Sequence, residues 1–206
     1  MIELSVLDKP YRCRTRDTLR FQETKQTIEL MVNEGKTLSE IRALSNNENI
    51  YNAASESRAR EISQLMNRRL RNIDKPFLEA FVKQPFETQK IMCVITVMLE
   101  DHSFFSFMDS VYREKLIVGN LRLKDSDIVS FIHGLQSESE SAAKWTDPGI
   151  KKMKDNFKEI LGGSGLISSD EGTERKILRP IITFGLTDIL EKEHLDRVKK
   201  ILAGER

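Results

Sequence analysis

Cysteine is scarce in this 206-residue chain, which contains only Cys13 and Cys93. The two lie far apart, no CxxC pair occurs, and the three histidines are scattered. A zinc site needs Cys or His ligands clustered at short spacings, so the sequence argues against one. Cys93 falls in an apolar run and is expected to be a small core residue. We therefore expect reduced thiols in a cytoplasmic protein.

Long hydrophobic runs are also missing. The longest apolar stretch is Ile91–Leu99, which as a helix covers about 14 Å, whereas the hydrocarbon of a bilayer is about 30 Å thick. This run therefore predicts a buried helix and no membrane crossing. The N-terminus is charged and is interrupted by Pro10, so it does not resemble a secretory signal.

Catalytic signatures are a third absence. The chain has no phosphate-binding P-loop, no dinucleotide-binding glycine motif, no nucleophile elbow and no HExxH motif. Glu100 and Asp101 fall at a predicted helix end and are interpreted as solvated charges, and His133 lies on an amphipathic segment. Nothing here predicts nucleophilic or general acid–base catalysis. We expect no enzyme, no cofactor, no metal and no small-molecule substrate, with an unrecognised type of enzyme as an open alternative.

Charge is plentiful but almost balanced. Charged residues make up 32% of the chain and the net charge is +1. Residues 1–75 carry 14 Lys and Arg against 11 Asp and Glu, residues 76–141 carry 6 against 10, and residues 142–206 carry 13 against 11. Two mildly basic ends thus flank an acidic middle. This pattern either reflects chance or indicates two basic faces on a neutral body.

Apolar residues recur at helical spacing along nearly the whole chain. The predicted fold class is therefore all-α, a multi-helix globular bundle with helix-turn-helix or winged-helix-like regions and at most one short β-hairpin. Three subdomains, expected to pack as one compact unit, are predicted. The first is helix-turn-helix-like and covers residues 1–75, the second is a central helical core at 76–120, and the third is winged-helix-like and covers 121–206. The predicted helices cover residues 17–35, 37–44, 55–72, 76–82, 85–100, 148–161 and the chain after 186, with two more capped by Ser103 and by Asp125 or Ser126.

The predicted helix 55–72 is the first candidate binding element. Its polar side is rich in arginine and amide side chains, and arginine reads guanine while asparagine and glutamine read adenine. A short helix at 37–44, opened by the capping box Thr37-Leu38-Ser39-Glu40, gives a helix-turn-helix outline. The polar stretch Ser45–Asn49 lies in the predicted turn between these two helices, residues 45–54, which is longer than the usual turn of about three or four residues. The open alternative is an amphipathic helix with a solvated face. The candidate DNA-binding residues here are Ser55, Ser57, Arg58, Arg60, Gln64, Asn67 and Arg68.

The predicted helix 148–161 is the second candidate. Thr146-Asp147-Pro148 is a typical helix start, and lysines recur on the polar side, where they could contact phosphates without reading sequence. Extended segments are expected at Gly165–Ser168 and Lys176–Leu178, with a polar turn at Ser169–Arg175, which together suggest a winged helix-turn-helix. A solvated lysine face is again the alternative. The candidate residues are Lys151, Lys152, Lys154, Lys158, Arg175 and Lys176.

The run from Glu48 to Leu70 has an asparagine stretch, a serine-rich helix start and a basic helix ending in Arg69-Leu70. Further recognisable segments in the second half of the chain are Phe104-Phe105, Gly119, Asp127–Phe131, Trp145-Thr146 and Gly165-Leu166. In these segments the sequence resembles the BrxA family of BREX phage-resistance systems.

The BrxA resemblance implies an all-helical protein with winged-helix character that binds double-stranded DNA. It implies neighbours in the same system, including a methyltransferase, a phosphatase-like protein and an ATPase, and it supplies no catalytic residues. The function expected from sequence is therefore a non-catalytic, DNA-binding component of a bacterial phage-defence system. The alternative is an adaptor that docks other components without binding DNA itself.

Overall fold

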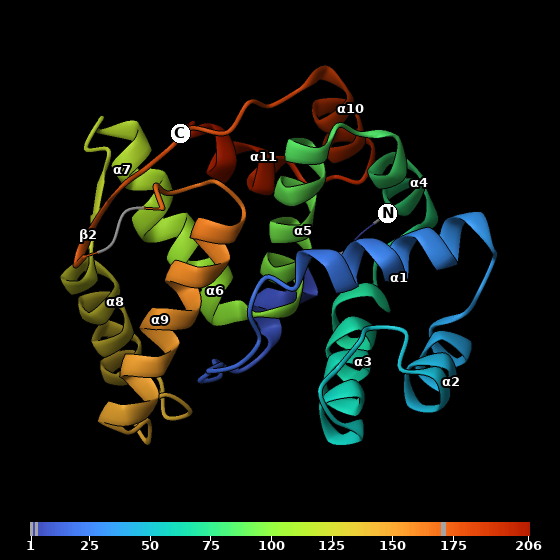
Figure 1. Cartoon of the computed structure of the whole chain (residues 1–206). Coiled ribbons are helices and arrows are strands. Elements are labelled where there is room, and N and C mark those ends of the chain that lie inside the picture. Colours follow the sequence, from blue (N-terminus) through green and yellow to red (C-terminus); the bar gives the residue numbers. More distant parts are fainter. Residues whose placement is uncertain (1, 3, 170–171) are drawn as a thin grey trace.

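Helix α5 (Phe86–Glu100) runs through the middle of the molecule, as the computed structural model shows (Figure 1). The structure describes residues 2, 4–169 and 172–206. Within these residues the chain is mostly helical, with one two-stranded antiparallel sheet, so the predicted fold class is confirmed. Val94, Ile95 and Met98 are fully buried, as is Cys93, which confirms the predicted core helix.

The chain enters the fold through a short 3-10 turn (Ser5–Asp8) and an irregular segment, residues 9–20, which we call the strap. Helix α1 (Phe21–Asn33) follows, so the predicted helix start at Asp17 is wrong. The reason is local: Arg20 adopts the left-handed conformation at φ 51° and ψ 47°. The carbonyl groups of Asp17, Thr18 and Leu19 accept hydrogen bonds from a buried arginine instead of helix amides.

Helix α2 (Leu38–Glu48) starts with the predicted capping box at Thr37 and Glu40. It continues four residues beyond Leu44, so the polar stretch at 45–49 does not end it as expected. Ser45 explains the difference, because its side chain is buried and its hydroxyl donates to the carbonyl oxygen of Ala59. The turn to the next helix is correspondingly shorter than predicted.

The remaining elements of the first half are α3 (Glu56–Leu70) and α4 (Lys75–Lys83), both close to their predicted bounds. Beyond α5, α6 (His102–Phe107), a π-helical turn (Met108–Tyr112) and α7 (Arg113–Ile117) follow one another without a break. Asp101, and not the predicted Ser103, caps α6, because its carboxylate accepts hydrogen bonds from the Ser103 and Phe104 amides.

A small sheet organises the second half of the chain. Strand β1 (Arg122–Lys124), which apolar spacing does not predict, precedes α8 (Asp125–Glu138) and α9 (Asp147–Gly163), and β2 (Glu174–Lys176) then pairs antiparallel with β1. Ile167 forms an isolated bridge with Ile177 on the other side of β2, in the two segments expected to be extended. Residues 170 and 171 of the predicted turn lie outside the described residues.

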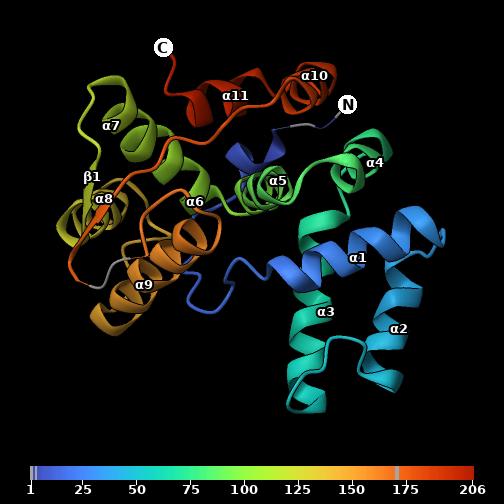
Figure 2. The same cartoon turned by 45° about the horizontal axis from the view of Figure 1, so that its top comes forward.

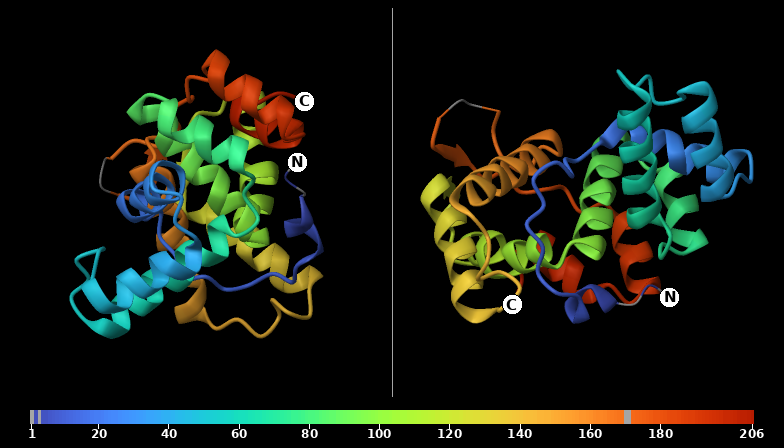
Figure 3. Two further views of the ribbon diagram at one scale, coloured as in Figure 1. Left: turned by 90° about the vertical axis from the view of Figure 1, so that its right-hand side faces the viewer. Right: turned by 90° about the horizontal axis from the view of Figure 1, so that it is seen from below.

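Helices α10 (Phe184–Lys192) and α11 (Asp196–Ala203) close the chain and cover α5 on one side (Figure 2). One hydrophobic core extends from Ile2 to Leu202, and a smaller cluster lies between α2 and α3. Seen from below, the strap passes between α9 on one side and α3 on the other (Figure 3). The division at residues 75 and 120 stays a prediction.

No single helix within the described residues is both long and apolar enough to cross a membrane. Helix α5 and the following helical stretch His102–Ile117 meet the length and composition criteria only as a pair, and the pair is bent by 113°.

Candidate nucleic-acid interface

The N-terminal turn of α3 carries the first group of predicted contacts. Ser55 is the N-cap, and its hydroxyl oxygen accepts a hydrogen bond from the backbone amide of Arg58 at 3.2 Å. This hydroxyl is therefore used within the helix, where it satisfies one of the free amides of the first turn. Ser57 is exposed. Arg60 is exposed as well, and it binds the carboxylate of Glu56 at 3.1 Å.

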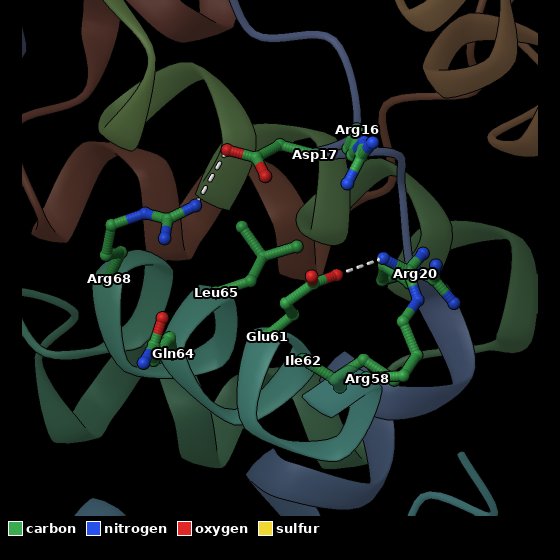
Figure 4. A pocket seen from close by; sticks show the side chains of 9 residues that line it. All are labelled: Arg16, Asp17, Arg20, Arg58, Glu61, Ile62, Gln64, Leu65 and Arg68. Atoms are coloured by element: carbon green, nitrogen blue, oxygen red, sulfur yellow. Dashed lines mark hydrogen bonds and ion pairs between the residues drawn. The ribbon is translucent and has the colours of Figure 1, made fainter. Parts of the chain in front are cut away.

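Further along α3, two arginines form ion pairs that the sequence did not reveal. Arg58 donates to Glu61 at 2.6 Å, and Arg68 contacts Asp17 of the strap at 2.7 Å (Figure 4). Arg68 also lies 3.3 Å from Glu100. The arginine-rich face is thus partly covered by the strap. Of the amide candidates, Gln64 is exposed and lines a hollow together with strap residues, and Asn67 is half-buried.

Helix α9 begins as predicted, with the hydroxyl of Thr146 accepting from the Gly149 amide. The lysines on its polar side divide into two pairs. Lys151 and Lys152 are exposed and form no ion pair with any residue that the structure describes.

Lys154 and Lys158 do not extend freely into solvent as the spacing suggested. Their ammonium groups lie 2.8 and 2.6 Å from the two carboxylate oxygens of Asp125, and each side chain is only 15% exposed. Burial raises the pKa of Asp125, but hydrogen bonds and charge from Lys154 and Lys158 outweigh it and lower the pKa overall. Asp125 therefore holds both lysines as a carboxylate at neutral pH.

The same aspartate ties α9 to the turn before β2. The amide of Asp125 donates to the carbonyl of Thr173, and the ammonium of Lys158 donates to the carbonyl of Gly172. Arg175, expected in the turn, lies with Lys176 in β2, where it pairs with β1; Lys176 is exposed and Arg175 is half-buried. The buried Nε of Arg175 has no hydrogen-bond partner among the described residues.

Sequence reasoning missed three arginines around the strap. Arg69 is 2% exposed, and its guanidinium donates to the carbonyls of Leu19, Asp17 and Thr18 at 2.8, 2.8 and 2.6 Å. The buried guanidinium of Arg69 thus fixes the backbone of the strap at residues 17–19, next to Arg16 and Arg20. The sequence did contain a signal for this burial. Position 69 falls within the apolar stripe of α3, between Met66 and Leu70, which are both buried.

Arg16, Arg20 and Arg58 bring the two candidate helices to one surface. Together with Glu159 of α9 and residues of α1, they line a hollow of about 460 Å³. A second hollow of about 140 Å³ lies beside it, over α3, and the close-up shows the three arginines on the same side of it (Figure 4). A third connects the start of α1 to Lys158 and Arg175. The surface from α3 across the strap to α9 and β2 is therefore continuous.

Within the described residues, no group of three His, Cys, Asp or Glu side chains is placed to hold a metal ion. The most perturbed carboxylate is Asp101, whose pKa is raised to about 7 by burial and by the nearby charge of Glu100. Its oxygens cap α6, which gives it a structural use.

The comparisons with known proteins agree over most of the chain. The BrxA family model matches residues 9–194. The chain belongs to the BrxA family. The BREX protein BrxA of Bacillus cereus (strain H3081.97) is 29% identical over 187 residues, which are 91% of this chain and 92% of that protein. The crystal structure of an uncharacterized protein from Magnetospirillum magneticum shares the fold, with a TM-score of 0.78, 17% identity, and coverage of 96% of this chain and 100% of that one.

Proposed function

We propose that this BrxA-family chain is a double-stranded DNA-binding, non-catalytic component of a BREX phage-defence system. Its family places it among the BREX proteins. The observation that carries DNA binding is the continuous surface formed by two adjoining hollows, which share Glu159 of α9. Arg16 and Arg20 of the strap and Arg58 of α3 line the first, and Lys158 of α9 and Arg175 line the second. Basic groups from both candidate helices can then follow one polyanion.

The order of elements in the second half supports a winged-helix interpretation. A helix, β1, α8, α9, a short bridge, a turn and β2 follow one another, as in winged helix-turn-helix domains. Helix α9 occupies the place of the recognition helix, which such domains insert in the major groove. Lys151 and Lys152 lie in its N-terminal half, exposed and without an ion pair to any described residue, and Lys176 lies beside the turn that would form the wing.

A fluorescence anisotropy titration with a short duplex, repeated at several salt concentrations, tests the proposal. The double variant Lys151→Ala and Lys152→Ala should lower affinity and reduce the slope of log K against log salt by about 0.9 per lost phosphate contact. The matched control is Lys75→Ala and Lys192→Ala, which removes the same charge from α4 and α10, away from this surface (Figure 1). Undetectable binding at low salt, or equal effects of both variants, would refute it. Competition with single-stranded DNA and duplex RNA identifies the preferred nucleic acid.

A second candidate function is docking of other BREX components, and exposed apolar side chains favour it. Ile181 and Phe184 are 83% and 88% exposed at the start of α10. The hydroxyl of Thr183 donates to the side chain of Gln84, so this segment lies beside the start of α5, where Phe86 is 49% exposed. Exposed apolar groups that gather in one place are typical of protein interfaces. Co-purification with the system's methyltransferase, phosphatase-like protein and ATPase tests this, with Phe184→Ser expected to abolish capture and leave DNA affinity unchanged.

A further inference from the structure

Three guanidinium groups converge where the strap, α1 and α3 meet. Arg16, Arg20 and Arg58 are the residues that the two adjoining hollows over the strap have in common. Arg20 and Arg58 each use one terminal nitrogen in an ion pair, to Glu23 at 2.8 Å and to Glu61 at 2.6 Å. Their other nitrogens carry no hydrogen bond to a side-chain carboxylate of the described chain. Arg16 is exposed and has no partner there at all.

The cluster is held in place by the fold. Arg20 has a left-handed backbone, which is strained for a non-glycine residue and persists only where its surroundings enforce it. Here the enforcing group is Arg69, whose guanidinium binds all three carbonyls immediately before Arg20. Burial disfavours the charged form of Arg69 and lowers its pKa, and the three carbonyl acceptors offset that cost.

We propose that Arg16, Arg20 and Arg58 form a phosphate-binding site. Three planar forks can surround a tetrahedral anion, whereas a carboxylate, with two oxygens, is matched by one fork. Thr15 and Thr18 line the larger hollow and supply hydroxyl groups. Ile62 and Leu65 line the smaller hollow over α3, and an apolar lining strengthens charge-assisted hydrogen bonds beside it. The carboxylates of both hollows are Glu23, Glu159, Asp17 and Glu61, and all but Glu159 are already ion-paired with arginine.

The phosphate has two sources, a DNA backbone or a free phosphate ester. Binding of a DNA phosphate at this site rests on the proposed function, since the site lies between α3 and α9 on the surface proposed to bind duplex DNA. Binding of a free phosphate ester does not depend on that function. Arg69 is a positioning residue in either case, because it touches the strap and not the hollows.

The test uses the intact protein and two probes, inorganic pyrophosphate by isothermal titration calorimetry and a short blunt duplex by anisotropy. Arg16→Gln removes the unpaired guanidinium, and Arg42→Gln, on the exposed side of α2, makes the same charge change elsewhere. Arg16→Lys keeps the charge and loses the fork.

We expect Arg16→Gln to weaken binding of at least one probe about tenfold, as for a lost charge-assisted hydrogen bond. Arg16→Lys should recover only a fraction of this, and Arg42→Gln should change little. Loss of duplex affinity identifies the DNA backbone as the source, and loss confined to pyrophosphate identifies a free phosphate ester. Equal effects of Arg16→Gln and Arg42→Gln on both probes would overturn the site. If the lysine variants of α9 still weaken duplex binding in that case, the proposed function stands without it. If pyrophosphate binds and duplex does not, the site stands without the proposed function.

Discussion

Replacing Asp125 by asparagine separates the two lysines of α9 from the carboxylate that now holds them. Lys154 and Lys158 lie 2.8 and 2.6 Å from its two oxygens and are only 15% exposed. Asparagine keeps the size of the side chain and one acceptor oxygen but removes the negative charge. The loss of two partly buried ion pairs should lower the free energy of unfolding by about 1–2 kcal/mol. Chemical denaturation followed by circular dichroism measures this.

The same substitution should strengthen DNA binding. Each lysine that becomes free to meet a phosphate adds about 0.9 to the slope of log K against log salt, so the slope should steepen by up to about 1.8. A twofold reduction of salt would then tighten the variant's binding by up to about 3.5-fold more than that of the wild type. Anisotropy titrations with one duplex at several salt concentrations provide the slopes.

Asp127→Asn is the matched control, because it also raises the net charge by one in the first turn of α8. Its carboxylate binds Lys115 at 2.8 Å and does not touch α9. Equal slopes for the two variants would show that overall charge matters and that Lys154 and Lys158 do not contact phosphate. A weaker affinity of Asp125→Asn at every salt concentration would show that the carboxylate positions α9 and does not mask it.

Three further outcomes are expected. Arg69→Met should lower the free energy of unfolding by about 3 kcal/mol or more, because three buried carbonyls lose their donor; a thermal melt close to that of the wild type would contradict the proposed hold on the strap. Asp101→Asn keeps the acceptor that caps α6 and removes a carboxyl group whose pKa is raised to about 7. Between about pH 4 and 7 the folded protein keeps a proton that the unfolded chain has released, so wild-type stability should fall as pH rises through this window and then level off. The variant should lack this slope and be more stable than the wild type by about 4 kcal/mol at pH 8, because this is the free energy that corresponds to a pKa raised from 3.8 to about 7. Parallel denaturation curves at pH 5 and pH 8 would contradict this. Ser55→Ala should cost about 1 kcal/mol of stability as a lost helix cap and leave DNA affinity unchanged, whereas lost affinity would make the hydroxyl a phosphate contact.

Local signals in the sequence were sufficient for most helices. The capping box at Thr37 and the cap at Thr146 are short-range hydrogen-bond patterns, and both are present. The errors arise where a distant residue decides the local conformation. Residues 17–20 have helical periodicity, yet Arg69, some fifty positions away, binds their carbonyls and delays α1 to Phe21.

The candidate site shows the same limit. Spacing placed Lys151, Lys154 and Lys158 on one polar face, but it could not show that Asp125 of another helix covers two of them. Spacing also gave no role to Arg69, which is buried and holds the strap. Ion pairs between elements depend on tertiary packing, which residue periodicity does not encode.

These ion pairs limit how well the number of basic residues predicts the salt dependence of DNA binding. Most cations of the surface already have a carboxylate within the chain, such as Glu61 for Arg58 and Asp125 for Lys158. A phosphate that replaces such a carboxylate gains less than one that meets a free cation, because an existing attraction must first be broken. The salt slope should therefore count mainly the exposed cations that have no ion pair among the described residues, which are Lys151, Lys152, Lys176 and Arg16. It should be about 3.6 rather than the larger value that the number of nearby cations suggests. A measured slope well above that value would mean that the ion pairs open on binding, and the excess over the unpaired groups would give their number.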